Sequence, residues 1–218
     1  MEIHMTPLVR PATAEDAEFL AWVMLTASRG NGARGLWDLL LDASDAVCLE
    51  YLRRLALSEP RSLCHYSSFL VAETEGIPAA ALCGFAFQEG GWATVAQAQA
   101  NVRRELHWTD ADLAASEQRM APLWTCFLPD LGADWGIENV ATRAEFRRTG
   151  LTQLLLQQVL CQGAKQGCRL TQISTMIGND AAISAYEKAG FRLSDEKRCP
   201  PIEAALGTPG FVRLIREL

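Results

Sequence analysis

One short basic segment has the composition of an anion-binding turn. It reads Arg147-Arg148-Thr149-Gly150-Leu151-Thr152 and lies between a predicted strand and a predicted helix. The first turn of a helix carries backbone N–H groups without intrahelical partners and the positive end of the helix dipole, and both favour an anion. Gly150 permits close approach of the backbone, and Arg143, Arg147 and Arg148 add positive charge. A diphosphate is the natural occupant, although an ordinary solvated helix start has the same composition.

The spacing within this segment argues against two common nucleotide sites. A Walker loop requires Gly-Lys-Ser or Gly-Lys-Thr, which is absent here. The dinucleotide fingerprint requires glycines in the order Gly-x-Gly-x-x-Gly, whereas the segment contains only Gly150. The residues alone therefore indicate an anion without identifying it.

Strand and helix patterns alternate around the basic segment. Apolar runs predict strands at 137–142 and 170–177, and a stripe beginning at Leu151 predicts an amphipathic helix ending near 163–167. Residues 181–189 predict another helix, which Gly190 would cap. Two closing strands are expected after this helix, at 191–193 and 211–215. A loop should join these two strands because the connection contains Pro200, Pro201, Gly207, Pro209 and Gly210.

The N-terminal part predicts a strand, a helical layer and a hairpin. Leu8–Arg10 has a strand pattern, and Thr13 with Asp16 resembles a capping box at a helix start. Helical spacing resumes after a glycine-rich break at 29–35, with an interruption near Ser44. The pattern then changes, and residues 67–87 predict two strands joined by a turn at Glu75-Gly76.

Residues 90–135 form a segment of different character. Residues 95–106 and 110–120 have helical spacing, and the segment carries more acidic than basic side chains. A helical insertion with a solvated acidic face is one interpretation. A lid that shapes the acceptor pocket is the other.

Several motifs together resemble the GNAT superfamily of N-acetyltransferases. In that family an Arg/Gln-x-x-Gly-x-Gly/Ala motif opens the helix after the fourth strand and holds the coenzyme A diphosphate through backbone amides. Arg147, Gly150 and Thr152 occupy its defining positions, although Thr152 replaces the usual glycine or alanine. The run from Asn179 through Tyr186-Glu187-Lys188-Ala189-Gly190-Phe191 is similar to a second family signature. The resemblance is strongest over 137–193 and absent over 90–135.

The resemblance implies a set of cofactor contacts. The helix start would hold the diphosphate, with a Thr152 hydroxyl able to bond a phosphate oxygen. Strand 137–142 would pair with the pantetheine arm and polarise the thioester carbonyl through backbone N–H groups. Asn179 would bond the pantetheine or the end of the fifth strand, or act as a plain helix N-cap. The expected cofactor-binding residues are Val140, Ala141, Thr142, Arg147, Arg148, Thr149, Gly150, Leu151, Thr152 and Asn179.

Transfer of an acyl group from a thioester to an amine requires a base and an acid. The amine must lose a proton before it attacks, and the departing thiolate gains one. Tyr186 occupies the position of the family's tyrosine acid, although it could instead be a buried packing residue. Glu138 is the candidate base, acting through water, and its alternative is a solvent-facing strand carboxylate. Glu105 or Asp134 could replace it if the insertion folds over the site.

Composition limits the remaining possibilities. The chain has 218 residues, 49% of them apolar, and a net charge of −6, which argues against binding nucleic acid through phosphate contacts. The N-terminus lacks a secretion signal, and no apolar run is long enough to span a membrane. Seven dispersed cysteines favour reduced thiols and a cytoplasmic location. Three distant histidines predict no metal site, and the adjacent Cys64-His65 lacks a third activating group.

The sequence therefore predicts a single acyltransferase domain, residues 1–218, of the α/β (α+β) class. We expect a mixed, twisted sheet of six or seven strands with helices on both faces, a helical insertion at 90–135 between the third and fourth strands, and a coenzyme A-binding core at 137–193. The expected activity is acetyl transfer from acetyl-coenzyme A, without a metal, to a small-molecule or peptide amine, in a ternary complex. A non-catalytic acyl-coenzyme A sensor, a different acyl donor and a hydroxyl acceptor remain alternatives. Pairing through the sheets of two copies, as in many relatives, would give a homodimer.

Overall fold

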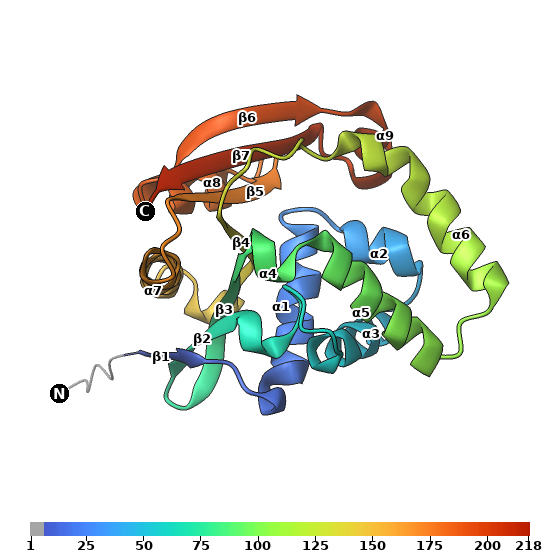
Figure 1. The fold of residues 1–218 in the computed structure, drawn as a ribbon, viewed down its shortest axis with the longest axis horizontal. Helices are drawn as coiled ribbons and strands as arrows, with labels where there is room; N and C mark the ends of the chain where they lie inside the picture. The colour runs from blue at the N-terminus through green and yellow to red at the C-terminus, as the bar shows by residue number, and fades with distance from the viewer. Residues whose placement is uncertain (1–6) are drawn as a thin grey trace.

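Seven strands form one mixed sheet, and helices cover both of its faces (Figure 1). The computed structural model describes residues 7–218. The strand order is β1-β2-β3-β4-β5-β7-β6, and only β4 and β5 pair in parallel. The strands are β1 (Leu8–Pro11), β2 (Phe69–Thr74), β3 (Ile77–Ala86), β4 (Trp135–Thr142), β5 (Leu170–Met176), β6 (Arg192–Arg198) and β7 (Gly210–Glu217). The predicted fold class is confirmed.

The helices divide between the two faces of the sheet. They are α1 (Ala17–Arg29), α2 (Leu36–Leu41), α3 (Asp45–Leu57), α4 (Phe87–Gly90), α5 (Trp92–Glu105), α6 (Asp110–Met120), α7 (Leu151–Lys165), α8 (Asp180–Lys188) and α9 (Pro200–Leu206). In β2, Phe69 and Val71 belong to the core beneath α1 and α3, whereas Leu70 and Ala72 belong to the core beneath α7. This alternation follows from the two-residue period of a strand. Two separate apolar cores thus hold the sheet between its helical layers.

The sheet opens between its two parallel strands. β4 and β5 pair only from Trp135–Ile137 to Thr171–Ile173, although both strands continue beyond this point. On its other side β4 remains paired with β3 as far as Thr142, and β5 remains paired with β7 as far as Met176. The two strands therefore diverge while each stays bound to its outer neighbour.

A bulge in β4 lies at the point of divergence. Cys83 is opposite Glu138 and Ala81 is opposite Ala141, so two steps along β3 match three steps along β4. Asn139 accommodates the extra residue with a positive φ of 54°. Asparagine tolerates this left-handed conformation better than most residues, and a bulge increases the local twist.

The insertion packs beside α2 and α3. The predicted helices are present as α5 and α6, followed by the 3₁₀ helix η3 (Ala121–Cys126). Ser116 Oγ donates to Leu40 O at 3.0 Å, and Arg119 Nε donates to Leu39 O at 2.9 Å. The acidic side chains of α6 are exposed, which agrees with a solvated acidic face.

Two expectations about the fold are wrong. The connection between the last two strands is not a plain loop, because α9 begins at Pro200, where a helix tolerates proline, and ends at Gly207 in the left-handed conformation. The cysteines are not all reduced thiols, since Cys126 and Cys199 form a disulfide. These two residues are separated by 73 positions in sequence, but the fold brings their Cα atoms within 5.4 Å. Cys48, Cys64, Cys83, Cys161 and Cys168 are free.

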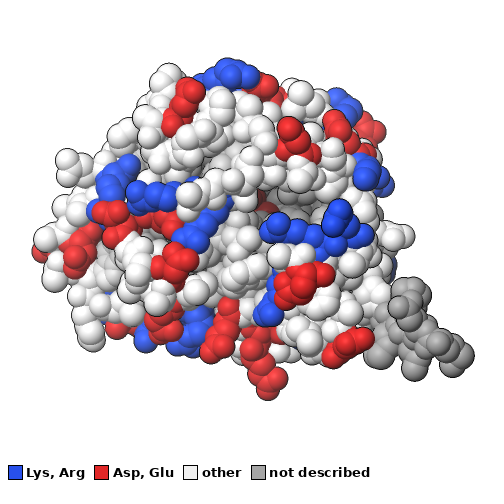
Figure 2. Space-filling model, turned by 180° about the vertical axis from the view of Figure 1, so that it is seen from behind, with Lys and Arg blue, Asp and Glu red and all other residues white. Residues whose placement is uncertain are grey.

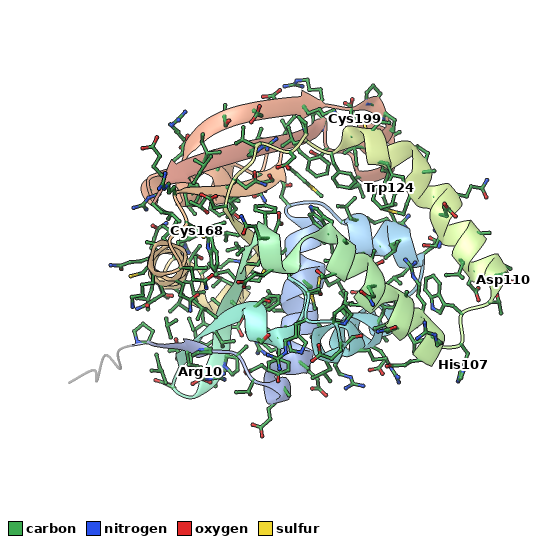
Figure 3. All side chains as sticks on the ribbon, in the orientation of Figure 1. Arg10, His107, Asp110, Trp124, Cys168 and Cys199 are labelled. Atoms are coloured by element: carbon green, nitrogen blue, oxygen red, sulfur yellow. A yellow bond between two sulfur atoms is a disulfide. The ribbon has the colours of Figure 1, made fainter. Side chains whose placement is uncertain are left out.

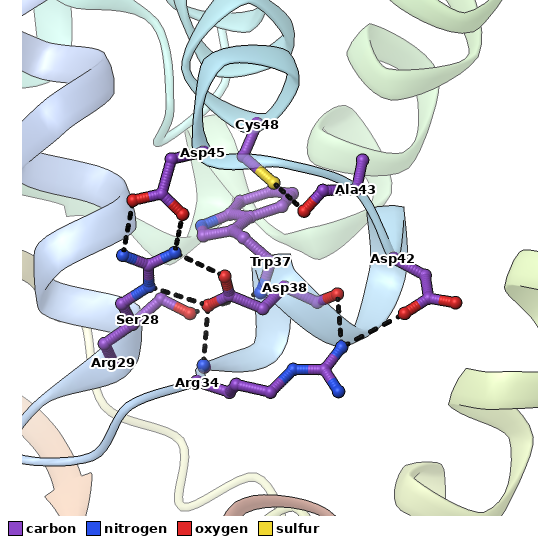
Figure 4. A network of polar contacts seen from close by, with 10 residues as sticks. Ser28, Arg29, Arg34, Trp37, Asp38, Asp42, Ala43, Asp45 and Cys48 are labelled. Atoms are coloured by element: carbon purple, nitrogen blue, oxygen red, sulfur yellow. Dashed lines mark hydrogen bonds and ion pairs between the residues drawn. The ribbon is translucent and has the colours of Figure 1, made fainter.

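An ionic network fixes the corner between α1, α2 and α3 (Figure 4). Arg29 donates to both carboxylate oxygens of Asp38, at 3.0 and 2.6 Å, and it also binds Asp45. Asp38 further accepts from Gly35 N at 2.7 Å. Burial alone would raise the pKa of Asp38, but the hydrogen bonds from Arg29 and Gly35 hold that pKa below its ordinary value. Asp38 therefore ties the loop at residues 30–35 to the helical layer.

We predict that Asp38→Asn destabilises the protein by about 2 kcal/mol, because it leaves the partly buried Arg29 without its main ionic partner. Asp42→Asn is the control, since Asp42 and Arg34 form an exposed pair at 3.2 Å whose loss should cost less than about 1 kcal/mol. Urea unfolding at pH 7 measures both changes. Equal losses in the two variants would show that the buried network does not hold the corner.

Candidate active site

The start of α7 is open to an external anion. Gly150 is the N-cap residue with a φ of 90°, and none of the described side chains caps the helix. The turn that precedes it, residues 144–150, is largely exposed, and a Cβ built on Gly150 would meet no atom within 4 Å. Among the described residues, the first amides of α7 thus have no side-chain acceptor, and the space beside Gly150 is open.

The basic side chains of this turn have separate positions. Arg147 and Arg148 are exposed, and Arg147 Nε donates to Thr142 O at 3.4 Å. Arg143 points elsewhere, because its guanidinium lies over the rings of Phe19 and Trp22, 5.1 and 5.8 Å from their centroids. The expectation that Arg143 supplies charge at the turn is therefore wrong. Figure 2 shows Lys and Arg side chains beside a hollow near the centre of the back face.

Two threonine hydroxyls join the end of β4 to the start of α7. Thr142 Oγ1 and Thr152 Oγ1 are 3.1 Å apart, and either can be the donor. Thr149 Oγ1 donates to Phe146 O at 2.6 Å inside the turn, and Leu151 is buried in the α7-side core. The helix start is thus fixed directly to the strand that borders the gap.

One edge of β4 is free beside that helix start. Ala141 and Thr142 pair with Ala81 and Ala80 of β3, while the opposite edge of β4 has lost its β5 partner after Ile137. Val140 lies between the bulge residue and these pairs and contacts the α7-side core. An extended ligand chain in the gap would find unpaired main-chain groups along this edge.

Glu138 lies at the bulge with a strongly perturbed carboxyl group. Burial raises the pKa of Glu138 to about 7. Its neighbour Ile137 belongs to the α7-side core, so strand alternation directs Glu138 to the face covered by α1. The charge of Glu138 adds to the rise in the pKa of Cys64 and Cys83, both in the α1-side core. A carboxyl group that titrates near neutrality can accept and release a proton.

Tyr186 approaches the gap from the opposite face. It lies on α8, is 5% exposed, and contacts Phe191 edge to face with ring centroids 6.4 Å apart. Burial raises the pKa of Tyr186, and the charge of Glu138 raises it further. Gln153 Nε2 donates to Ala185 O at 2.7 Å and so fixes α8 to the first turn of α7. The phenol therefore stays protonated across the physiological range.

Three other candidate residues are engaged elsewhere. Asn179 occupies the N-cap position of α8 without capping it, and its Nδ2 donates to Thr175 Oγ1 on β5 at 3.0 Å. Asp134 accepts from the main-chain N of Arg169 and Leu170, at the start of β5. Glu105 is exposed and lies 3.7 Å from Arg54. Neither Asp134 nor Glu105 is positioned to replace Glu138.

Cys64 and His65 lack the arrangement of a nucleophile and its activating base. Within residues 7–218, no group of three or more His, Cys, Asp or Glu side chains could hold a metal ion. Burial raises the pKa of Cys64 to about 12, which makes it a poor nucleophile, and His65 Nδ1 lies 2.7 Å from Ser67 Oγ. In this part of the chain, none of the helices combines the length and apolar character needed to cross a bilayer.

Sequence reasoning missed two residues that shape the site. Asn139 forms the bulge, and its position inside a strand pattern is the signal that could have revealed it, since asparagine is poorly suited to strands. Gln153 joins α7 to α8, but a lone glutamine on a helix carries no such signal.

Comparisons with known proteins agree with this geometry. A family model described as the acetyltransferase (GNAT) family matches residues 33–191, more than half of the chain. An acetyltransferase crystal structure aligns with a TM-score of 0.69 and 17% identity, covering 96% of this chain and 98% of that one. An N-acetyltransferase from Staphylococcus aureus Mu50 aligns with a TM-score of 0.63 and 18% identity, covering 96% and 100%. No curated protein matches the chain.

A third structure contains a cofactor. An aminoglycoside acetyltransferase in complex with coenzyme A aligns with a TM-score of 0.53 and 16% identity, covering 97% of this chain and 95% of that one. At such identities these structures show a shared fold and no more. The family model shows more than the fold, because it matches the sequence of residues 33–191, which include the hairpin, the divergent strands and the start of α7. The chain belongs to the GNAT acetyltransferase family, and it is an acyltransferase by that membership.

Proposed function

We propose that the protein transfers an acetyl group from acetyl-coenzyme A to a primary amine by direct attack in a ternary complex. The observation that carries this proposal is the continuity between an uncapped helix start and a free strand edge. The space beside Gly150 at the start of α7 is open, and the Thr142–Thr152 contact joins this helix start to β4, which borders the gap. A ligand with a diphosphate and an extended amide-containing arm matches both parts.

The residues present fit coenzyme A in chemical type. Leu151, Thr152 and the exposed Arg147 and Arg148 would hold the diphosphate, with Thr149 and Gly150 shaping the turn. Main-chain groups of Val140, Ala141 and Thr142 would bind the pantetheine arm and polarise the acyl carbonyl. Asn179 would support the arm indirectly, because its amide already bonds to the end of β5. When bound, the cofactor supplies an activated acyl group as a thioester.

Glu138 would remove the proton from the acceptor. A lysine-like amine has a pKa of about 10.4 and is almost fully protonated at neutral pH, so it needs a base. The pKa of Glu138, raised to about 7 by burial, makes this carboxylate a stronger base than an ordinary glutamate, so it can assist removal of that proton. Its position on the α1 side of the gap assigns that face to the acceptor.

Tyr186 would return a proton to the leaving thiolate. Burial and the Glu138 charge raise its pKa, so the phenol remains protonated while Glu138 ionises. At neutral pH Glu138 can therefore be ionised, as a base must be, while Tyr186 still carries its proton, as an acid must.

An amine is the acceptor class that similar proteins favour. An agmatine N-acetyltransferase aligns with a TM-score of 0.53 and 15% identity, and the aminoglycoside acetyltransferase adds a second amine-bearing acceptor. The net charge of −6 also favours a cationic acceptor. A homodimer stays a prediction. A cytoplasmic location also stays a prediction, and it was based on wholly reduced cysteines, which the Cys126–Cys199 disulfide contradicts.

We predict that Gly150→Ala weakens coenzyme A binding by about tenfold or more, since a methyl group would occupy the space assigned to the diphosphate. Gly167→Ala is a matched control: Gly167 follows the other end of α7, has a similar φ of 82°, and also has no atom within 4 Å of a built Cβ. Both variants carry similar backbone strain, of about 1 kcal/mol. Isothermal titration calorimetry should separate them, and equal affinities would remove the diphosphate from this turn.

Tyr186→Phe should lower kcat by about a hundredfold while leaving the affinity for coenzyme A within about twofold, because only the proton donor is lost. Thiol release with a reactive amine measures the rate, and Tyr66→Phe serves as a control at a half-buried tyrosine on the α1 side. Full turnover by Tyr186→Phe from pH 6 to 9 would show that the phenol is not the acid.

Glu138→Gln should lower kcat by about a hundredfold and change its pH dependence. A base must be ionised to act, so the wild-type rate should rise through pH 7 and level off above it. The variant should lose this rise. Glu187→Gln, at an exposed position on α8, is the control. An unchanged rise in Glu138→Gln would assign the titration to another group.

Thiol release also separates the proposed enzyme from the alternative sensor. A sensor would bind acetyl-coenzyme A but release no thiol with any amine. An enzyme that uses a different acyl donor, or a hydroxyl acceptor, would release thiol only when that donor or acceptor is supplied.

A further inference from the structure

The Cys126–Cys199 disulfide joins two segments that have no role in the proposed chemistry. Cys126 ends η3 within the insertion, and Cys199 directly precedes α9 between β6 and β7. Figure 3 shows Cys199 and Trp124 where the insertion meets the end of β6 and the start of β7. The bond therefore connects the insertion to the C-terminal hairpin.

From Cys126 the chain crosses the sheet as an extended segment, residues 127–133, hereafter the crossing segment (Figure 1). Phe127 stacks on Phe211 of β7, with centroids 5.7 Å apart and rings 15° from parallel. Lys197 Nζ donates to Phe127 O at 2.9 Å, and the buried Arg213 donates to Pro129 O at 2.7 Å. Non-covalent contacts thus hold the crossing segment against β7 and β6 as well.

The crossing segment lies on the same face of the sheet as Glu138. Phe211 and its β5 partner Met176 belong to the α1-side core, against which Phe127 packs. β5 is the strand that borders the gap opposite β4. The crossing segment therefore lies over β7, the outer neighbour of β5, on the face proposed for the acceptor.

On the Cys199 side, α9 reaches the loop at residues 30–35. Leu206 O lies 3.8 Å from a Cβ built on Gly32, and Asn31 Nδ2 donates to Gly178 O at 3.0 Å. Thr208 Oγ1 donates to Ile177 O at 3.0 Å, just after β5. The loop, the end of α9 and the end of β5 thus meet at the divergent end of the gap.

The diphosphate turn and α7 lie on the opposite face of the sheet, so in the proposed reaction the amine would enter the gap from the α1 side. We propose that the Cys126–Cys199 disulfide controls acceptor binding: when bonded it holds the crossing segment and α9 as one wall of the acceptor site, and when reduced it releases that wall. This inference rests on the proposed transfer function for its effect on turnover, whereas its structural part stands separately.

Reduction requires a dithiol of the thioredoxin or dithiothreitol class. The dithiol gives two electrons and two protons, the Cys126–Cys199 bond breaks to two thiols, and the reductant closes to its own disulfide. Cys126 is fully buried and Cys199 is 8% exposed, so the wall must open locally before a thiolate can reach the bond. The two apolar cores on either side of the sheet are expected to keep the reduced protein folded.

The test compares oxidised wild type, dithiothreitol-reduced wild type and the double variant Cys126→Ser/Cys199→Ser. Cys161→Ser is the control, because Cys161 is a free, exposed thiol on α7. Reduction and the double substitution should each raise the KM for the amine by about fivefold and leave the calorimetric affinity for coenzyme A within about twofold. The control should respond to reductant as wild type does, and the double variant should not respond.

Amide hydrogen exchange on the same samples gives a readout that does not depend on turnover. Reduction should speed exchange in residues 127–133, 200–206 and 30–35 and leave α7 unchanged. Unchanged exchange in these three segments would overturn the proposal whether or not the protein is active, as would an unchanged amine KM or a reductant effect that persists in the double variant. If hydrogen exchange changes as expected in these segments but no amine causes thiol release from acetyl-coenzyme A, the result would instead contradict the proposed function.

Discussion

The site depends on the divergence of two parallel strands that remain anchored on their outer sides. β4 and β5 pair for three residues and then separate, while β3 and β7 stay bound to them. This is a property of the sheet and not fraying of its edge, because both strands lie in its interior. The left-handed residue Asn139 places a bulge in β4 at the point of separation. Main-chain groups that a closed sheet would consume thus become available to a ligand.

The divergence also explains how two weak functional groups can act on one reacting centre. Glu138 reaches the gap from the α1 side and Tyr186 from the α7 side, and the charge of the first raises the pKa of the second. Burial moves both pKa values upward, so Glu138 titrates near pH 7 while Tyr186 keeps its proton. In the proposed reaction, one opening in the sheet would therefore have its base on one face and its acid on the other.

Local patterns predicted the parts of the structure that local rules determine. The capping residues Thr13 and Asp16, the hairpin around Gly76 and the helix start at Gly150 depend on nearby residues, and all three form as expected. The positions of Tyr186 and Glu138 came from the family motifs, and their roles stay predictions. The α9 helix was missed because two prolines in succession resemble a loop, yet both fit the first turn of a helix.

Contacts between distant residues could not be predicted in this way. The disulfide, the stacking of Arg143 on α1 and the crossing of β7 by Phe127 each join residues far apart in sequence. No periodic pattern encodes such contacts, since they follow only from the completed fold. The insertion is the largest such case: its helices were predicted, but their packing against α2 and α3 was not.

A crystal structure of the protein with coenzyme A would locate the ligand relative to the gap between β4 and β5. We expect diphosphate oxygens within hydrogen-bond distance of the main-chain N atoms of Leu151 and Thr152, and a pantetheine arm along the free edge of β4 with its sulfur between Glu138 and Tyr186. A cofactor bound outside the gap, with those amides unoccupied by its phosphates, would contradict this expectation.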